Sequence, residues 1–147
     1  MDNANPRWVN DSTTQSIQSD TIYGVPSAIL KTAVVAGGND TALTVRTWQY
    51  DTPRSNSFMI LLHFADFQTQ LRQFDIRINE NESGPNDTCY LTATHTYAED
   101  WATDGSYNIT LVATNASVLP PMINALEIYV RVPYETPTTL PQDCKSV

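Results

Sequence analysis

Aromatic and acidic side chains occur together in predicted loops and at predicted strand ends, a combination that suits carbohydrate binding. An aromatic ring excludes water when it lies against the C–H face of a sugar, and nearby polar groups fix the hydroxyls. The candidates are Tyr23, Tyr50, Tyr97 and Trp101, with Asp100 and Asp104 near the last two in sequence. The same rings could instead close the ends of the fold, and both interpretations stay open. The predicted ligand-binding set is Tyr50, Tyr97, Asp100 and Trp101.

Catalysis would need converging carboxylates, or a nucleophile beside a base. The available acids and bases are Asp66, Glu80, Glu99, Asp100, His63 and His95, but the sequence has no GxSxG, HExxH or paired acid motif. His63 lies inside the most apolar run and is expected to be a satisfied core residue. Asp66 follows that run and is expected to hydrogen-bond a turn. We therefore predict a protein that is not an enzyme.

Metal binding is not favoured by the spacing of the candidate ligands. Asp100 and Asp104 flank a turn and could offer oxygens to Ca²⁺, but they match no known calcium loop. The two cysteines and two histidines are not at zinc spacing. We predict no metal site and no cofactor.

Six Asn-x-Ser/Thr sequons occur where roughly two are expected by chance for a three-residue pattern. The predicted N-glycosylation sites are Asn10, Asn39, Asn81, Asn86, Asn108 and Asn115. This excess indicates a secreted glycoprotein surface. The start, MDNANPRW, has neither the basic nor the apolar region of a signal peptide, and no run is apolar enough to cross a membrane. We expect the signal and anchor to lie outside this chain.

The two cysteines and the net charge restrict the setting further. Cys89 and Cys144 could form one disulfide that ties the tail to the fold, or remain free thiols or pair with other segments. The net charge of -8 argues against nucleic acid and anionic lipid as partners, because both are held by basic patches.

The elements that would position these residues are predicted to be strands. Phe58–Phe67 is a continuous apolar run, typical of a central strand covered on both faces. Phe74–Asn79 and Tyr107–Ala113 alternate between apolar and polar residues, typical of half-buried strands. Leu43–Tyr50 and Ile123–Val132 alternate as well. With 147 residues, the chain is expected to form one main domain.

Other segments give weaker signals. We expect short strands near Ser16–Gln18 and Tyr90–Thr94, and a strand rather than a helix over Ala28–Val35. Glu80–Thr88 is expected to be a polar surface loop, and Tyr97–Gly105 has the least clear pattern. Seven or eight strands predict an all-β antiparallel sandwich of the jelly-roll, galactose-binding-like type. The predicted division is an extended N-terminal segment over 1–20, the sandwich over 21–133 and a Pro/Thr-rich tail over 134–147.

Four stretches resemble the malectin-like domain of plant receptor-like kinases, in particular those with leucine-rich repeats. They are YGVPSAILKTA at Tyr23–Ala33, LLHFADFQ at Leu61–Gln68, RQFDIRIN at Arg72–Asn79 and YNITLVATNASVLPPMINALEIY at Tyr107–Tyr129. The resemblance covers one unit, similar to the second of a tandem pair. It implies a lectin-like β-sandwich on the extracellular side of the plasma membrane, as part of a receptor that perceives a ligand. No sugar-contacting residue is carried over from the family.

The sequence and the resemblance together predict a non-enzymatic extracellular recognition module. Its expected partner is a cell-wall carbohydrate or a secreted peptide, with a co-receptor protein as a further partner. The alternative is a structural spacer that orients neighbouring domains and binds no small ligand of its own. A third hypothesis is an accessory domain of a carbohydrate-active enzyme.

Overall fold

The structure is a computed structural model that describes residues 8–46, 57–99 and 106–131. Nearly all of its regular structure is β, which confirms the predicted all-β class. The elements are β1 (Trp8–Ser12), α1 (Ser27–Leu30), β2 (Thr32–Ala36), β3 (Ala42–Arg46), β4 (Ser57–Phe64), β5 (Gln73–Ile78), β6 (Asn81–Asp87), β7 (Thr94–Glu99), β8 (Asn108–Ala113), β9 (Met122–Ile123) and β10 (Ala125–Arg131). In this part of the chain no helix is long and apolar enough to cross a membrane.

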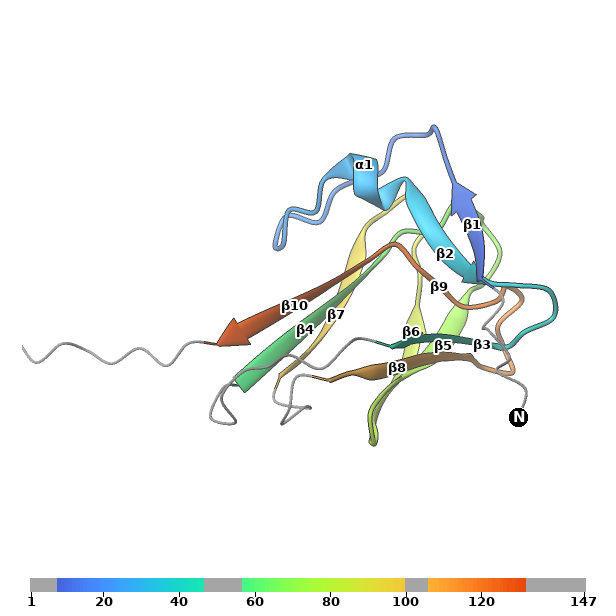
Figure 1. The fold of residues 1–147 in the computed structure, drawn as a ribbon. Helices are drawn as coiled ribbons and strands as arrows, with labels where there is room; N and C mark the ends of the chain where they lie inside the picture. Colours follow the sequence, from blue (N-terminus) through green and yellow to red (C-terminus); the bar gives the residue numbers. More distant parts are fainter. Residues whose placement is uncertain (1–7, 47–56, 100–105, 132–147) are drawn as a thin grey trace, which may run out of the picture.

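The strands form three antiparallel sheets, ordered β1-β2-β9, β10-β4-β7 and β3-β8-β5-β6. Figure 1 shows β4, β7 and β10 as one layer, and β3, β5, β6 and β8 as a second layer below it. The main core lies between these two layers. Its members include Phe58, Ile60 and Leu62 of β4, Phe74, Ile76 and Ile78 of β5, and Ile109 and Leu111 of β8. This arrangement is the predicted β-sandwich.

β4 is the central strand of its sheet, as its continuous apolar run predicts. It pairs with β10 on one side and β7 on the other. Phe58, Ile60 and Leu62 point into the core, whereas Leu61 and His63 belong to the outer side and are nevertheless buried. Both faces of β4 are therefore covered, which explains why its sequence does not alternate.

β5 and β8 confirm the alternating patterns. Phe74, Ile76 and Ile78 of β5 are fully buried and alternate with more exposed residues. In β8, Ile109 and Leu111 are buried, and Asn108 is exposed as predicted. These strands pair with each other, so their apolar sides form one continuous inner face.

Two predictions of local structure were wrong. Ala28–Val35 was predicted as one strand, but its first part belongs to α1. Pro26 precedes that single helical turn with a φ of -55°, the turn buries Leu30, and β2 begins after Lys31. Glu80–Thr88 was predicted as a loop, but it contains β6. β6 is an edge strand with mostly exposed side chains, and backbone pairing with β5 holds it although it has no apolar face.

The ends of several strands also differ from the prediction. The N-terminal segment contains β1, which pairs with β2, whereas only the isolated bridge from Gln18 to Thr92 lies near the strand expected at Ser16–Gln18. The strand expected at Tyr90–Thr94 begins only at Thr94, as β7. The last predicted strand is divided into β9 and β10 at Asn124. For these reasons the described residues contain ten strands rather than seven or eight.

Candidate ligand-binding face

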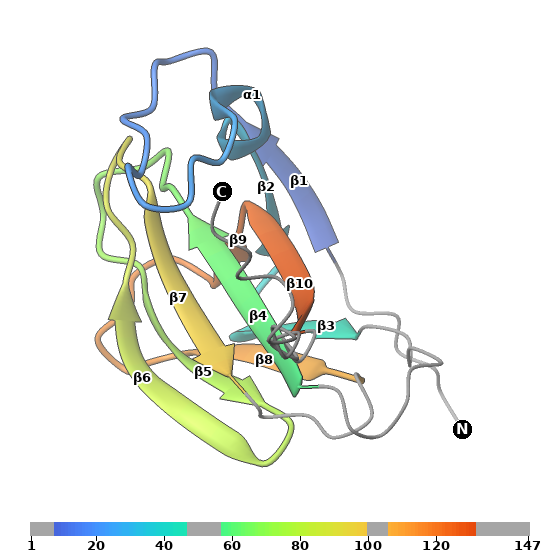
Figure 2. The ribbon, with the colours of Figure 1, turned by 90° about the vertical axis from the view of Figure 1, so that its left-hand side faces the viewer.

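The outer face of the β10-β4-β7 sheet carries two exposed tyrosines, Tyr97 on β7 and Tyr129 on β10. Their exposed fractions are 55% and 49%. Because side chains alternate along a strand, Glu99 shares the outer side of β7, and Glu127 and Arg131 share that of β10. Figure 2 looks towards β7, β4 and β10, with the segment before α1 at their upper end. We call this surface the tyrosine face; its residues are Leu61, Tyr97, Glu99, Glu127, Tyr129 and Arg131.

The strand register fixes the spacing of the two tyrosines. Tyr97 lies opposite Leu61 and Tyr129 lies opposite Met59, so β4 runs between them. β7 and β10 are two strand spacings apart, about 10 Å. Leu61 is fully buried between them. The tyrosine face therefore presents a phenol side chain on each side of β4, above a leucine that is covered.

Charged groups stand next to both rings. Tyr129 donates its hydroxyl to Oε2 of Glu127, and this hydrogen bond raises the pKa of Tyr129. A guanidinium nitrogen of Arg131 lies 2.9 Å from Oε2 of Glu99, and this pair spans β4 from β10 to β7. Both partners are about half exposed, so the pair adds little stability and can exchange for a ligand group. The face therefore offers hydrogen-bond donors and acceptors beside its aromatic rings.

A histidine cluster closes the upper end of the tyrosine face. His63 and His95 lie directly opposite each other on β4 and β7. The ring of Tyr23 packs edge-on against both, with centroid distances of 6.2 Å to His63 and 4.6 Å to His95. Nδ1 of His95 contacts a carboxylate oxygen of Asp20. These contacts fasten the segment from Asp20 to Tyr23 onto the sheet.

His63 is buried as predicted, and its Nε2 faces the carboxylate of Glu127. Its Nε2 lies 3.1 Å from Oε1 of Glu127, without the alignment of a hydrogen bond to any described group. Burial lowers the pKa of His63, and the charge of Glu127 opposes that shift. The pKa of Asp20 is lowered by a hydrogen bond from the backbone N–H of Ile22 and by His95. At neutral pH the cluster therefore combines a neutral His63 with an ionised Asp20.

Asp66 lies outside this face and has a structural role. As expected, it caps a turn, because its Oδ1 accepts a hydrogen bond from the backbone N–H of Gln68 at 3.0 Å. It also accepts hydrogen bonds from Nε of Arg72 at 2.7 Å and from the hydroxyl of Thr88 at 2.7 Å. Asp66 and Arg72 are only 1% and 2% exposed. The carboxylate is therefore not available to a substrate.

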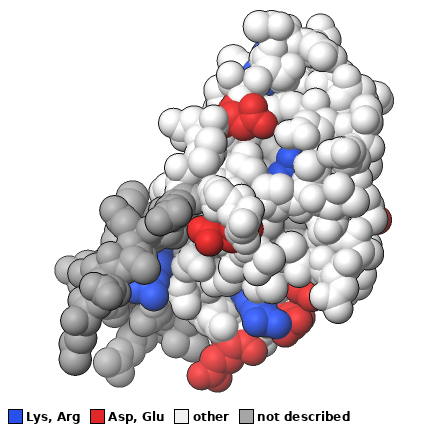
Figure 3. Space-filling model, turned by 90° about the vertical axis from the view of Figure 1, so that its right-hand side faces the viewer, with Lys and Arg blue, Asp and Glu red and all other residues white. Residues whose placement is uncertain are grey.

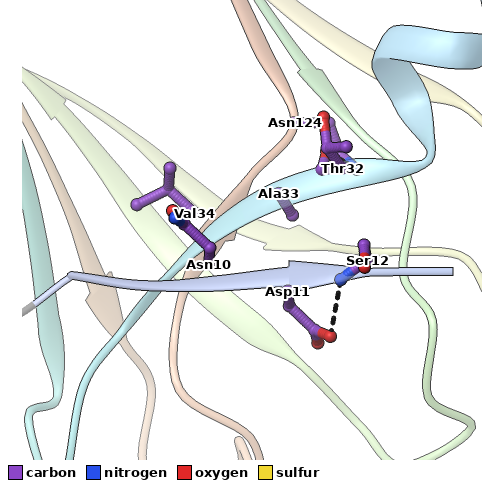
Figure 4. Close-up of a pocket in the computed structure, with 7 residues that line it drawn as sticks. All are labelled: Asn10, Asp11, Ser12, Thr32, Ala33, Val34 and Asn124. Atoms are coloured by element: carbon purple, nitrogen blue, oxygen red, sulfur yellow. Dashed lines mark hydrogen bonds between the residues drawn. The ribbon is translucent and has the colours of Figure 1, made fainter.

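A second surface feature is a hollow of roughly 330 Å³ beside β1 and β2. Its lining residues are Asn10, Asp11, Ser12, Thr32, Ala33, Val34 and Asn124 (Figure 4). The amide of Asn124 is already engaged, since it donates to the carbonyl oxygen of Leu30 at 2.8 Å and accepts from the N–H of Ala65 at 2.7 Å. The hollow thus has small side chains and no exposed aromatic ring in its lining. It is a weaker candidate than the tyrosine face.

Only part of the predicted site can be compared with the structure. Of the predicted binding set, Tyr97 is exposed on β7, and Tyr50, Asp100 and Trp101 lie outside the described residues. Their roles in binding stay predictions. Tyr129 was not among the candidates, although it shares the polar phase of the alternating last strand with Glu127 and Arg131.

The remaining predicted sites have mixed settings. Cys89 is exposed, and Cys144 lies outside the described residues, so their disulfide stays a prediction. Five sequon asparagines are exposed, and Asn86 is half-buried. Within residues 8–46, 57–99 and 106–131, no group of three His, Cys, Asp or Glu side chains is arranged to hold a metal. On the side opposite to that in Figure 2, charged atoms lie in small separate groups and the described surface shows no extended basic patch (Figure 3).

Comparison with known proteins identifies the family. The model of the malectin-like domain matches residues 1–131. The Arabidopsis thaliana protein named "Probable LRR receptor-like protein kinase At1g51890" is 33% identical over 129 residues, which is 80% of this chain and 14% of that protein. This chain thus spans about one seventh of that relative's length.

Solved structures show the same fold. The ANX2 ectodomain of Arabidopsis thaliana superposes with a TM-score of 0.65 at 19% identity, over 83% of this chain and 39% of that one. A complex of the plant peptide RALF23 with FER and LLG2 matches with a TM-score of 0.63 at 16% identity, over 83% of this chain and 38% of that one. The matched part of the ANX2 chain belongs to an ectodomain. The chain therefore belongs to the malectin-like domain family and is similar to the ectodomains of plant receptor-like kinases.

Proposed function

We propose that this domain is the recognition module of a receptor on the extracellular side of the plasma membrane, and that its tyrosine face binds the ligand. The observation that carries the proposal is the half-exposed pair Tyr97 and Tyr129, one on each side of β4. Large rings held on strands cost little conformational entropy when they bind, because the sheet already positions them. The ligand is a cell-wall carbohydrate or a secreted peptide.

The chemistry of the face supports a carbohydrate. A linear oligosaccharide lying across β4 would place sugar rings on Tyr97 and Tyr129. Glu127 and Glu99 would accept hydrogen bonds from hydroxyls, and Arg131 would donate. The hydrogen bond from Tyr129 to Glu127 holds that ring in one orientation before a ligand arrives.

A structural neighbour supports a peptide. FER was solved in complex with the plant peptide RALF23 and with LLG2. An analogous complex of this domain would include a secreted peptide and a co-receptor. A tyrosine-rich surface with adjacent carboxylates also suits peptide side chains, because tyrosine combines a large apolar area with a hydroxyl that can donate and accept.

The positions of the sequons support the choice of surface. β4, β7, β10 and the segment over 13–31 contain none of the six sequons. Attached glycans are bulky, and a binding surface must stay clear of them. No glycan would therefore be attached on the strands of the tyrosine face or on the segment at its upper end.

Two probes test the proposal on the secreted domain: an array of plant cell-wall oligosaccharides, and synthetic RALF23 with and without LLG2. The variants are Tyr97→Ala and Tyr129→Ala. The matched control is Tyr90→Ala, because Tyr90 is 44% exposed but lies outside the three strands of the tyrosine face. We expect binding of one probe class that both variants weaken at least tenfold and the control retains. Binding that survives both variants, or no binding by folded protein, would refute the proposal.

The spacer hypothesis remains the alternative function, and the exposed edge strand β1 favours it. Trp8 and Val9 on β1 are 49% and 52% exposed, which provides apolar area for a neighbouring domain. This hypothesis predicts that neither probe binds. It also predicts that Trp8→Ser loosens the packing of neighbouring extracellular segments in the full receptor, measurable by limited proteolysis.

A further inference from the structure

The six sequon asparagines occupy two different structural settings. Five side chains are exposed on strands or turns: Asn10, Asn39, Asn81, Asn108 and Asn115. Asn86, on β6, is half-buried. Since a glycan needs open space around the amide nitrogen, this difference is relevant to which sites can be modified in the folded protein.

Asn86 points between the two layers of the sandwich. It lies opposite Phe74 in the β5–β6 pairing, and directly paired residues project to the same side of a sheet. Phe74 is fully buried in the main core. The side chain of Asn86 is therefore directed inward at the edge of the sandwich, unlike the exposed side chain of Asn108 on β8.

One hydrogen bond of Asn86 joins the two layers, and a second lies within β6. Its Oδ1 accepts from the hydroxyl of Thr96 at 3.2 Å, and Thr96 belongs to β7 in the opposite layer. Its Nδ2 donates to the carbonyl oxygen of Ser83 at 3.1 Å, within β6. Both polar atoms of the amide are used by the fold.

The third residue of this sequon is also engaged. The hydroxyl of Thr88 donates to Oδ2 of Asp66 at 2.7 Å, in the buried cluster with Arg72. The sequon Asn86-Asp87-Thr88 therefore has structural roles at both of its defining side chains. By contrast, the asparagine side chains of the other five sequons are exposed.

We infer that Asn86 remains unglycosylated in the folded, secreted protein and links the two layers through its hydrogen bond with Thr96. The five exposed sequon asparagines carry the glycans. Glycan transfer joins Nδ2 to C1 of a sugar, releases an amide proton and displaces the lipid diphosphate that carries the oligosaccharide. At Asn86 the attached sugar would need room beside Nδ2, which donates to the carbonyl oxygen of Ser83 within β6. The half-buried amide would have to turn outward to make that room, and its contact with Thr96 would then be lost.

Site-specific mass spectrometry tests this inference on protein from a eukaryotic secretory host. Enzymatic glycan release in ¹⁸O-water converts each formerly glycosylated asparagine to labelled aspartate. Cleavage after glutamate yields Ser83–Glu99, a fragment in which Asn86 is the only sequon asparagine. We expect this fragment without label, and label at the five other sites. Label at Asn86 in most of the folded monomer would overturn the inference.

Two glutamine variants provide a second readout. Asn86→Gln should leave the glycan mass of the intact protein unchanged and lower its Tm by roughly 4–8 °C, because two hydrogen bonds are lost. Asn115→Gln, the control, should lose the mass of one glycan and, after glycan removal, keep the parent Tm. A loss of glycan mass in Asn86→Gln would contradict the inference. If that variant is not secreted, the unlabelled parent fragment remains the deciding result.

Discussion

Replacing Arg72 with methionine should destabilise the fold strongly, because it leaves a buried carboxylate without its cation. Arg72 places Nε and a terminal nitrogen on the two oxygens of Asp66, at 2.7 and 3.2 Å, and donates to the carbonyl of Pro120. Methionine keeps much of the side-chain volume, so the effect reports the charge and the hydrogen bonds. Breaking a buried pair on one side costs about 3–5 kcal/mol, which corresponds to a Tm lower by roughly 6–20 °C.

Urea denaturation followed by circular dichroism measures this loss. The matched control is Arg77→Met, because Arg77 forms a pair of 3.3 Å with Glu82 in which both side chains are about half exposed. That control should cost less than about 1 kcal/mol. The double variant Asp66→Leu/Arg72→Met should be more stable than Arg72→Met alone, since neither charge is left unpaired. The reasoning is refuted if Arg72→Met loses no more stability than the control does.

Three further changes test other parts of the structure. Burial lowers the pKa of His63 in the folded state, so the unfolded chain binds more protons once the pH drops below about 6.5. The free energy of unfolding, and with it Tm, should therefore fall as the pH decreases in that range. His63→Gln should make this decline in Tm between pH 5 and 7 smaller. Gly84→Ala should lower the free energy of unfolding by roughly 1–3 kcal/mol, since an added Cβ would lie 2.2 Å from Oδ1 of Asp75. In urea denaturation, the double variant Gly84→Ala/Asp75→Ala should recover part of this loss. Asn124→Ala should lower the free energy of unfolding by roughly 2–3 kcal/mol, because it removes the hydrogen bonds to the backbone of Leu30 and Ala65. The control Thr32→Ala, at an exposed position, should change Tm little.

The sequence predicts the strands whose burial leaves a pattern. β4 is apolar throughout because both of its faces are covered, and β5 and β8 alternate because one face is covered. β6 leaves no such pattern. It is held at a sheet edge by backbone hydrogen bonds, for which its side chains need not be apolar. α1 is too short, at one turn, for a helical period to be seen.

The candidate site depends on contacts between residues far apart in sequence, and this limits what the sequence can predict. Tyr97 was a candidate because it is an aromatic residue near acidic ones. Its partner surface includes Tyr129 and Arg131, which become neighbours only because β7 and β10 flank β4. The meeting of His63, His95 and Tyr23 likewise follows from strand register and loop placement, which no local pattern encodes.

The central claim is that a ligand binds on the tyrosine face, and chemical-shift mapping tests it most directly. The domain would be labelled with ¹⁵N and titrated with the oligosaccharide or peptide selected by the binding assay. We predict that the perturbed amides gather on β7, β4 and β10, around Tyr97 and Tyr129, and that those of β1 and β2 around Asn10 stay unchanged. Perturbations confined to β1 and β2, with none around Tyr97 and Tyr129, would contradict the account.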